Sequence, residues 1–146
     1  MPPFHKQETR YSCAPACLRM VLAALGRPMA EALLRVLTDC SPLGTDAFHL
    51  VEAARHLGFR ASRKYTLASL DDLATLRAEG RFPVVYVDLW PLHGGWSGQY
   101  HAMVVIDLDA DEVTVRDPLH GKRRIPREDF QEAWSAMRFL TIVIAA

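Results

Sequence analysis

The sequence lacks an excess of charge of either sign, because 17 basic and 17 acidic side chains cancel within its 146 residues. A chain without net charge has no overall field that attracts nucleic acid or an anionic membrane surface. Its apolar runs are shorter than a bilayer span, and residues 1–6 lack the apolar core of a signal peptide. These absences predict a cytoplasmic protein with no nucleic-acid partner and no membrane-spanning segment, and they favour small molecules or peptides as substrates.

Cysteine is also scarce, since Cys13, Cys17 and Cys40 are the only three. An odd number of cysteines without an export signal disfavours a disulfide framework and leaves free thiols as the expected state. The chain has no glycine-rich phosphate-binding loop and no Cys-x-x-Cys motifs with zinc-finger spacing. The sequence therefore predicts neither a cofactor nor a metal ion, and the thiols remain available for chemistry.

No repeat or low-complexity segment divides the chain. Half of the residues are hydrophobic, so residues 1–146 are expected to form one domain, with residues 1–6 as a flexible lead-in. Helical spacing of apolar residues covers 13–25, 30–37, the stretch from a cap at Thr45 to 57, the stretch from Ser69 to 80, and 126–137. Strand patterns cover 59–65, 83–89, 101–108, 112–117, 122–125 and 139–144, the last of them expected to lie buried inside the sheet. The pattern predicts helices first and a β-sheet after them.

The most informative stretch places Cys13 where the first helix begins. Pro15 is tolerated only in a first turn and Gly26 is a natural stop, so the helix is expected to start at Ser12 or Cys13. A sulfur there faces unpaired backbone N–H groups and the positive end of the helix dipole, which favour thiolate over thiol. Cys13 is therefore a candidate nucleophile. The alternative is a small buried hydrophobic residue, the commoner fate of a free cysteine.

A predicted β-hairpin supplies a partner for this sulfur. A tight turn through Asp109 to Asp111 pairs residues whose numbers sum to about 218 to 220, and His101 and Asp117 satisfy that sum. The two side chains are thus expected to be opposite or near-diagonal neighbours. A carboxylate beside an imidazole fixes its tautomer and stabilises the imidazolium, so the pair fits a general base and its orienting group. Taken singly, His101 reads as a capped strand residue and Asp117 as the opener of an Asp-Pro turn.

Residues 90–100, rich in glycine and aromatic side chains, are predicted to form a loop without regular structure between two strands. Trp90, Trp96 and Tyr100 are candidates for a substrate-binding wall, the alternative being that they fold back onto the surface. His93 is not expected to act as a base, because a loop flanked by glycine holds an imidazole poorly.

Taken together, these residues resemble a known family. Gln7-x5-Cys13, the Ala-Cys-Leu-Arg-Met helix that follows, His101 at the head of an apolar strand, and Asp117-Pro-Leu-His-Gly with a later Phe-x3-Trp are similar to the peptidase C39 family. The resemblance runs from about residue 7 to residue 140. It implies an α+β, papain-like fold with N-terminal helices packed on an antiparallel β-sheet. The best-known relatives are N-terminal domains of bacterial exporters that remove leader peptides after a Gly-Gly pair, and this chain looks like a stand-alone member.

The resemblance also assigns roles. Cys13 would attack a peptide carbonyl, His101 would relay the proton, Asp117 would hold His101, and Gln7 would donate its amide to the oxyanion beside the Cys13 N–H. The implied partner is a peptide or protein substrate. Ser12 and Ala14 depart from the Asp and Gly that commonly flank the nucleophile in the family, and Ala14 is expected to restrict the pocket beside the sulfur.

Three alternatives remain open from sequence. The same thiolate could transfer an acyl group to an amine or thiol, as an acyltransferase or amidase does, because the acyl-enzyme is common to both outcomes. The chain could instead be a non-catalytic peptide-binding module. A metal site from Cys13, Cys17 and a histidine is the third, although Cys17 is expected to pack in the core. His49 and His56, seven residues apart on one helix, are interpreted as surface or packing residues.

Overall fold

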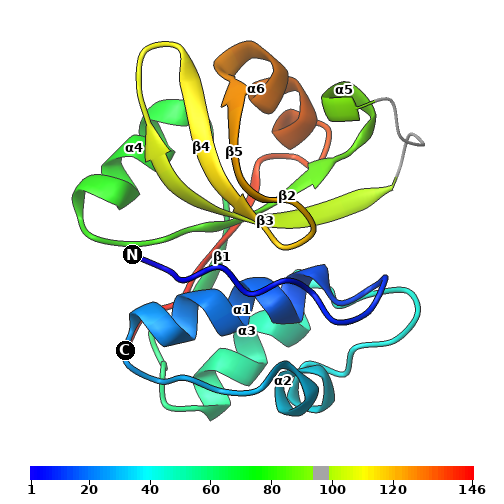
Figure 1. Ribbon diagram of the computed structural model, residues 1–146. Helices are drawn as coiled ribbons and strands as arrows, with labels where there is room; N and C mark the ends of the chain where they lie inside the picture. The colour runs from blue at the N-terminus through cyan, green and yellow to red at the C-terminus, as the bar shows by residue number, and fades with distance from the viewer. Residues whose placement is uncertain (94–98) are drawn as a thin grey trace.

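The computed structural model describes residues 1–93 and 99–146, and it begins with three helices (Figure 1). They are α1 (Cys13–Ala24), α2 (Glu31–Leu37) and α3 (Ala47–His56). The predicted order of helices before sheet is confirmed. Beyond α3 the described strands are β1 (Arg63–Thr66), β2 (Val84–Asp88), β3 (Tyr100–Leu108), β4 (Glu112–Asp117), β5 (Gly121–Pro126) and β6 (Leu140–Val143), with helices α4 (Leu70–Ala78), α5 (Trp90–His93) and α6 (Arg127–Ser135) between them.

The six described strands form one sheet in the order β1-β6-β2-β3-β4-β5, and every pairing in it is antiparallel. The strands β2 to β5 form a meander, in which each strand pairs with the next. The last strand, β6, enters the sheet between β1 and β2. Its buried position was expected from its continuous apolar run, because a strand with neighbours on both sides and both faces covered excludes water.

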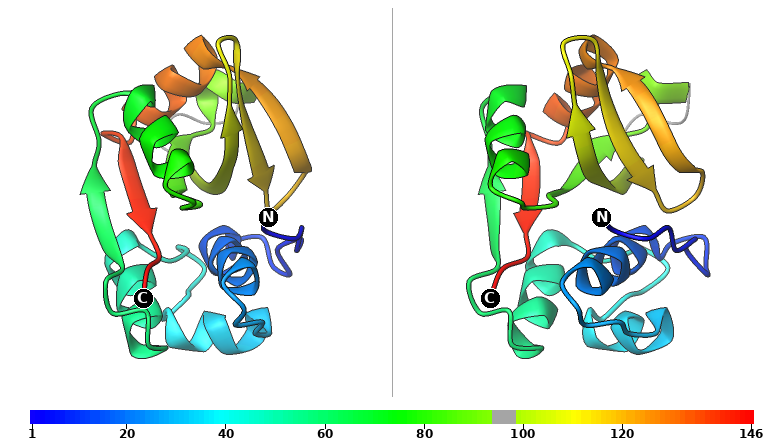
Figure 2. Two further views of the ribbon diagram at one scale, coloured as in Figure 1. Left: turned by 90° about the vertical axis from the view of Figure 1, so that its left-hand side faces the viewer. Right: turned by 60° about the vertical axis from the view of Figure 1, so that its left-hand side comes forward.

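Helices cover both faces of the sheet, and alternate residues of β2 show why. Val84 and Tyr86 pack in one core with α1, α2 and α3, whereas Val85 and Val87 pack in a second core with α4 and α6. Successive strand residues point to opposite faces, so a strand covered on both sides must be apolar throughout. In Figures 1 and 2, α1 to α3 lie together below the sheet, and β1 and β6 extend downward beside them.

Two local predictions were wrong. The third helix is capped by Asp46, not Thr45: the Asp46 carboxylate accepts a hydrogen bond of 2.8 Å from the N–H of His49. A carboxylate reaches the third N–H of a helix well, and its charge suits the positive end of the helix. The stretch 90–100 is not entirely irregular, because α5 forms one short turn after Asp88, whose carboxylate accepts from the N–H of Trp90 at 2.9 Å.

The N-terminal segment lies along the open end of the β3–β4 hairpin. Residues 1–6 form no helix or strand, yet the carbonyl oxygen of Pro2 accepts a hydrogen bond of 3.1 Å from Arg116. The N–H of Gln7 donates to the carbonyl oxygen of Pro118 at 2.8 Å. These contacts bring the chain that leads into α1 against the end of β4. Within the described ranges no helix has the length and apolar character to cross a membrane.

Candidate active site

Helix α1 begins at Cys13, as its sequence predicted, and the preceding residue, Ser12, bonds to the N-terminal loop and to α2. The Ser12 side chain does not cap the helix; its hydroxyl accepts from the N–H of Thr9 at 3.0 Å and lies 3.3 Å from the carboxylate of Glu31. The serine therefore ties the incoming loop to α2 instead of covering the first turn of α1. Cys13, only 7% exposed, stands in that first turn, where the helix dipole favours a negative charge.

His101 and Asp117 are in direct contact. The Nε2 atom of His101 lies 2.7 Å from Oδ1 of Asp117, and the two side chains are 5% and 1% exposed. Because Asp117 occupies Nε2, the other ring nitrogen, Nδ1, is left for a further partner, and Cys13 lines the same cavity as His101. The structure thus brings together three residues that are widely separated in sequence.

The register of the hairpin decides which faces these side chains occupy. Val104 lies opposite Arg116 near the open end, whereas Asp107 lies opposite Thr114 nearer the turn, so Ile106 forms a β-bulge. Continuing the first register puts Asp117 opposite Met103, two positions from His101 and on the same face. Without the extra residue the two side chains would point to opposite faces. The pair is therefore diagonal, and the bulge sets its geometry.

The charges in this cluster stabilise one another. Burial alone would lower the pKa of His101, but its hydrogen bonds to Asp117 and Cys13, together with their negative charges, raise the pKa to about 9. Burial would raise the pKa of Asp117, yet hydrogen bonds from His101, the N–H of Leu119 and Arg123 lower it to about 2. At neutral pH the site therefore holds an imidazolium between a carboxylate and a sulfur, the arrangement that makes a cysteine nucleophilic.

Gln7 is buried, at 6% exposure, and its N–H donates to the carbonyl oxygen of Pro118, the residue after Asp117. Its Nε2 atom donates to the carbonyl oxygen of Thr9 at 2.7 Å, and its Oε1 atom has no hydrogen-bond partner among the described residues. One of the two Nε2 hydrogens remains for another acceptor. Gln7 is not among the described residues that line the cavity at Cys13. Its predicted contact with an oxyanion thus remains a proposal.

The sulfur and the imidazole open into a cavity of about 290 Å³. The cavity is lined by Cys13, His101, Arg10, Tyr11, Pro42, Leu43, Gly44, Leu89, Gln99, Tyr100 and Leu119. Much of its rim is apolar and open to solvent, and Leu43 is 88% exposed. An exposed apolar rim around a polar centre is typical of a site that binds a partly apolar ligand.

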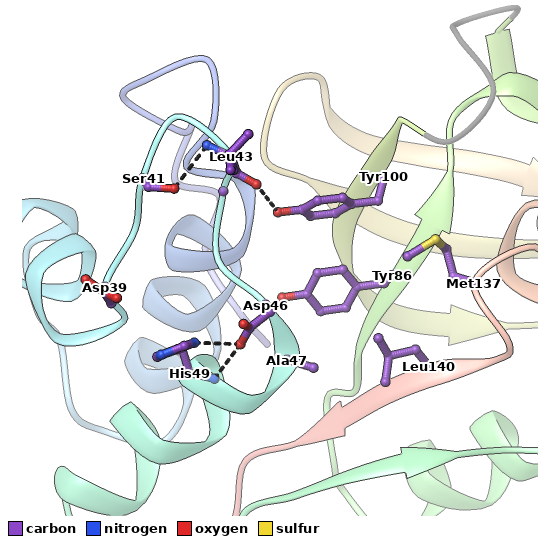
Figure 3. A pocket seen from close by; sticks show the side chains of 11 residues that line it. Asp39, Ser41, Leu43, Asp46, Ala47, His49, Tyr86, Tyr100, Met137 and Leu140 are labelled. Atoms are coloured by element: carbon purple, nitrogen blue, oxygen red, sulfur yellow. Dashed lines mark hydrogen bonds and ion pairs between the residues drawn. The ribbon is translucent and has the colours of Figure 1, made fainter.

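A second cavity of about 430 Å³ adjoins the first, and Leu43, Gly44 and Tyr100 line both. Figure 3 shows Tyr86 and Tyr100 projecting from the sheet into this second cavity, with Met137 and Leu140 beside them. The Tyr100 hydroxyl donates to the carbonyl oxygen of Leu43 at 2.9 Å. Burial is the main cause that raises the pKa of Tyr100 to about 12, so the hydroxyl remains a donor.

The three aromatic candidates for a substrate wall have different outcomes. Tyr100 lines both cavities, whereas Trp90 is 57% exposed at the start of α5 and is not among the residues that line either one. Trp96 lies outside the described residues. Cys17 is fully buried, and burial, with the charges of Cys13 and Asp117 nearby, raises the pKa of its thiol well above the ordinary value. A thiol held protonated is a poor metal ligand, so Cys17 acts in packing.

Sequence reasoning missed two charged residues in the surroundings of the site. Glu31 is completely buried on α2 and accepts hydrogen bonds from the N–H of Glu8, the Ser12 hydroxyl and Arg35. Arg123 on β5 donates to Asp117 at 3.1 Å. The only advance signal for Arg123 was its place in the strand after the Asp-Pro turn, and Glu31 gave none, because a glutamate in a first helical turn is ordinarily exposed.

A helix that begins with a cysteine, packed on an antiparallel sheet that carries a hydrogen-bonded histidine and aspartate, defines the papain-like class of fold. Within that class the chain belongs to the peptidase C39 family, whose model matches residues 2–143. The family resemblance and the α+β fold predicted from sequence are therefore confirmed.

Relatives and solved structures agree with this family. The chain is 30% identical over 129 residues to an uncharacterised protein of Methanothermobacter thermautotrophicus, covering 88% of this chain and 80% of that one. It is 31% identical over 137 residues to the transport/processing ATP-binding protein ComA of Streptococcus pneumoniae, covering 92% of this chain and 18% of ComA. The crystal structure of the peptidase domain of Streptococcus ComA superposes with a TM-score of 0.83, at 26% identity and with 99% and 98% of the two chains covered. A putative C39-like peptidase from Bacillus anthracis shares the fold at a TM-score of 0.80 and 20% identity, with 99% and 94% covered.

Proposed function

We propose that this chain is a cysteine peptidase that hydrolyses a peptide bond through Cys13, His101 and Asp117. The observation that carries the proposal is the position of His101, which is hydrogen-bonded to Asp117 and lines one cavity together with Cys13, whose negative charge raises the pKa of the imidazole. A buried imidazole held between a sulfur and a carboxylate serves no packing purpose that an apolar residue would not serve better. It is the arrangement that nucleophilic catalysis by cysteine requires.

The proposed reaction begins from a Cys13 thiolate and a His101 imidazolium. The Cys13 thiolate attacks the scissile carbonyl carbon, a C–S bond forms, and the carbonyl oxygen becomes an oxyanion that the Cys13 N–H and the Gln7 amide would stabilise. The imidazolium of His101 gives its proton to the leaving amine as the C–N bond breaks. Water then attacks the thioester and His101 takes the proton from that water. The C–S bond breaks, which releases the carboxylic acid product and restores the Cys13 thiolate beside the His101 imidazolium.

A peptide substrate is supported by the two adjoining cavities. The cavity lined by Tyr86 and Tyr100 is mostly apolar, and the rim of the cavity at Cys13 is open to solvent. Together they suit an extended peptide with bulky apolar side chains. The similar ComA is a transport/processing protein, and a double glycine motif protease with the same fold was solved in complex with a leader peptide, at 23% identity and a TM-score of 0.75. We propose that the chain cleaves a leader-type peptide after Gly-Gly. Residues 1–146 are proposed to act as a single domain. The predicted compartment is the cytoplasm.

Incubation of the protein with a peptide library that includes Gly-Gly sequences, followed by mass spectrometry of the products, tests this function. Hydrolysis adds one water to the two fragments, whereas acyl transfer to an added amine leaves a mass tag, so the products separate the two reactions. Cys13→Ala is expected to abolish cleavage. Cys40→Ala is the matched control and should retain it, because Cys40 lies outside the catalytic pair. A folded protein whose Cys13 reacts with iodoacetamide no faster than a free thiol, and which cleaves nothing, would instead be a peptide-binding module.

A further inference from the structure

Asp117 is held by more than the histidine that it orients. Its Oδ1 atom accepts from Nε2 of His101 at 2.7 Å and from the N–H of Leu119 at 2.8 Å. Its Oδ2 atom accepts from Nη1 of Arg123 at 3.1 Å. The carboxylate is only 1% exposed, so water cannot replace a missing donor. Both oxygens therefore depend on protein donors, and Arg123 is the donor that the structure gives to Oδ2.

The strand pairing explains how Arg123 reaches this position. Asp117 lies opposite Gly121 and Val115 lies opposite Arg123, so Arg123 is a diagonal neighbour of Asp117 on the same face of the β4–β5 ladder. The next residue, Arg124, lies opposite Thr114 and is exposed. Alternation along β5 therefore separates two adjacent arginines, one toward the carboxylate and one toward solvent.

We propose that Arg123 is a positioning residue of the active site, which acts through Asp117 on His101; this inference rests on the proposed peptidase function. A carboxylate with one buried oxygen lacking a donor can rotate or take up a proton. Either change weakens its hydrogen bond to Nε2, and His101 then holds the imidazolium form less firmly. The Cys13 thiolate loses its counter-ion as a result. Arg123 thus influences the geometry and the charge of Cys13 and His101 through its contact with Asp117.

The charge of Arg123 also acts directly on His101, in the opposite direction, because two cations repel. This effect is the smaller of the two. The guanidinium lies on the far oxygen of Asp117 and is 25% exposed, so solvent and salt screen its field at the imidazole. Its hydrogen bond to Oδ2, at 3.1 Å, is a direct contact with a buried group, where screening is weak. Removal of Arg123 is therefore expected to disfavour the imidazolium.

The test compares Arg123→Met with the matched control Arg124→Met, each in the wild type and in an Asp117→Asn background. The readouts are the rate of Cys13 alkylation by iodoacetamide, corrected for the reactivity of Cys40 with a Cys13→Ala variant, and kcat and KM for a cleaved peptide. Arg123→Met should slow alkylation at pH 7 and lower kcat by about tenfold with little change in KM, since loss of a charged buried hydrogen bond has that magnitude. Arg124→Met should leave both unchanged, and Arg123→Lys should restore part of the loss.

In the Asp117→Asn background Arg123→Met should have no further effect. Asp117→Asn has already removed the carboxylate through which Arg123 acts on His101. A full tenfold loss in that background would show that Arg123 acts on the fold and not through Asp117, and would overturn the proposal. An unchanged alkylation rate in Arg123→Met would overturn it as well. If Arg123→Met does not fold, Arg123→Gln replaces it in the same cycle. If no variant or wild-type protein cleaves a peptide while alkylation still depends on Arg123, the peptidase function fails and the positioning role stands.

Discussion

His101 and Asp117 are diagonal neighbours in the β3–β4 hairpin, and the β-bulge at Ile106 gives them a common face. An antiparallel ladder without that bulge would put the imidazole and the carboxylate on opposite sides of the sheet. Bulges near active sites commonly re-aim one side chain in this way. The pairing is therefore a property of strand register as much as of the two residues, and it can be tested through both.

Loss of each member of the pair should reduce cleavage in a fixed order. His101→Gln removes the proton carrier, and its kcat should fall at least as far as that of Asp117→Asn, for which a loss of about 10²- to 10⁴-fold is expected because the imidazole loses its orienting charge. Steady-state kinetics on the cleaved peptide would measure both. Equal activity of Asp117→Asn and wild type would contradict the role given to Asp117.

The stability of the protein should fall as the pH rises through about 9, owing to His101. The pKa of His101 is raised from 6.5 to about 9 in the folded protein, so folding is favoured by protonation. That contribution, about 3 kcal/mol at most, is complete below pH 6.5 and is lost as the pH passes the folded pKa. Thermal melts of wild type and His101→Gln across this range should show a difference in Tm that narrows toward alkaline pH. A constant difference would mean that the charge of His101 does not contribute to folding.

Asp117 should give the opposite dependence at the acid end. Its pKa is lowered from 3.8 to about 2, so its contribution is present above pH 3.8 and is lost as the pH falls through about 2. Acid titrations of wild type and Asp117→Asn, followed by circular dichroism, should therefore converge at the lowest pH. Curves that stay apart there would assign the effect to packing instead of ionisation.

Gly44 is expected to tolerate no side chain, because a Cβ atom would stand 1.9 Å from the Tyr100 hydroxyl oxygen and the residue has a φ of +89°. Gly44→Ala should therefore destabilise the protein by about 1 to 3 kcal/mol for the backbone strain, with a further cost from the clash. Gly26→Ala is the matched control, since its φ is +83° but nothing lies within 4 Å of its Cβ position. Urea unfolding should show the larger loss for Gly44→Ala, and Tyr100→Phe should recover part of the difference. Equal losses at the two glycines would contradict the close packing of the Tyr100 hydroxyl against Gly44 at the boundary of the two cavities.

Glu31 should matter for both stability and turnover. Replacement by Ala removes the common acceptor of the Glu8 N–H, the Ser12 hydroxyl and Arg35, although Arg35 keeps Glu8 as a partner, and such a loss costs about 1 to 3 kcal/mol. The loop from Gln7 to Ser12 should then hold Cys13 less firmly and lower kcat. Glu52→Ala is the control, because Glu52 pairs with Arg55 at the surface, where 49% of its side chain is exposed. Unfolding midpoints and kinetics of the two variants would show whether Glu31 supports only the fold.

Much of the site follows from local patterns, and the remainder depends on contacts across the fold. The start of α1 at Cys13 follows from Pro15 and Gly26, and the nearness of His101 and Asp117 along the hairpin follows from its length. The bulge that gives the two side chains a common face could not be predicted from sequence, because Ile106 continues the apolar run from Met103 and no glycine marks an extra residue there. Glu31 could not be found either, since its burial depends on the packing of α2 against the N-terminal loop. Helical pattern alone did not separate Thr45 from Asp46 as the cap of α3.

The position of β6 between β1 and β2 determines when the sheet can be completed during synthesis. Residues 140–143 pair with β1 on one side and β2 on the other, so the sheet has a gap until this strand arrives. Translation delivers Cys13 early and β6 late, and a nascent chain would hold the thiol with an unfinished scaffold. Folding of the complete sheet therefore waits for the C-terminal strand, and Cys13 acquires its full scaffold only after residue 143 has been synthesised.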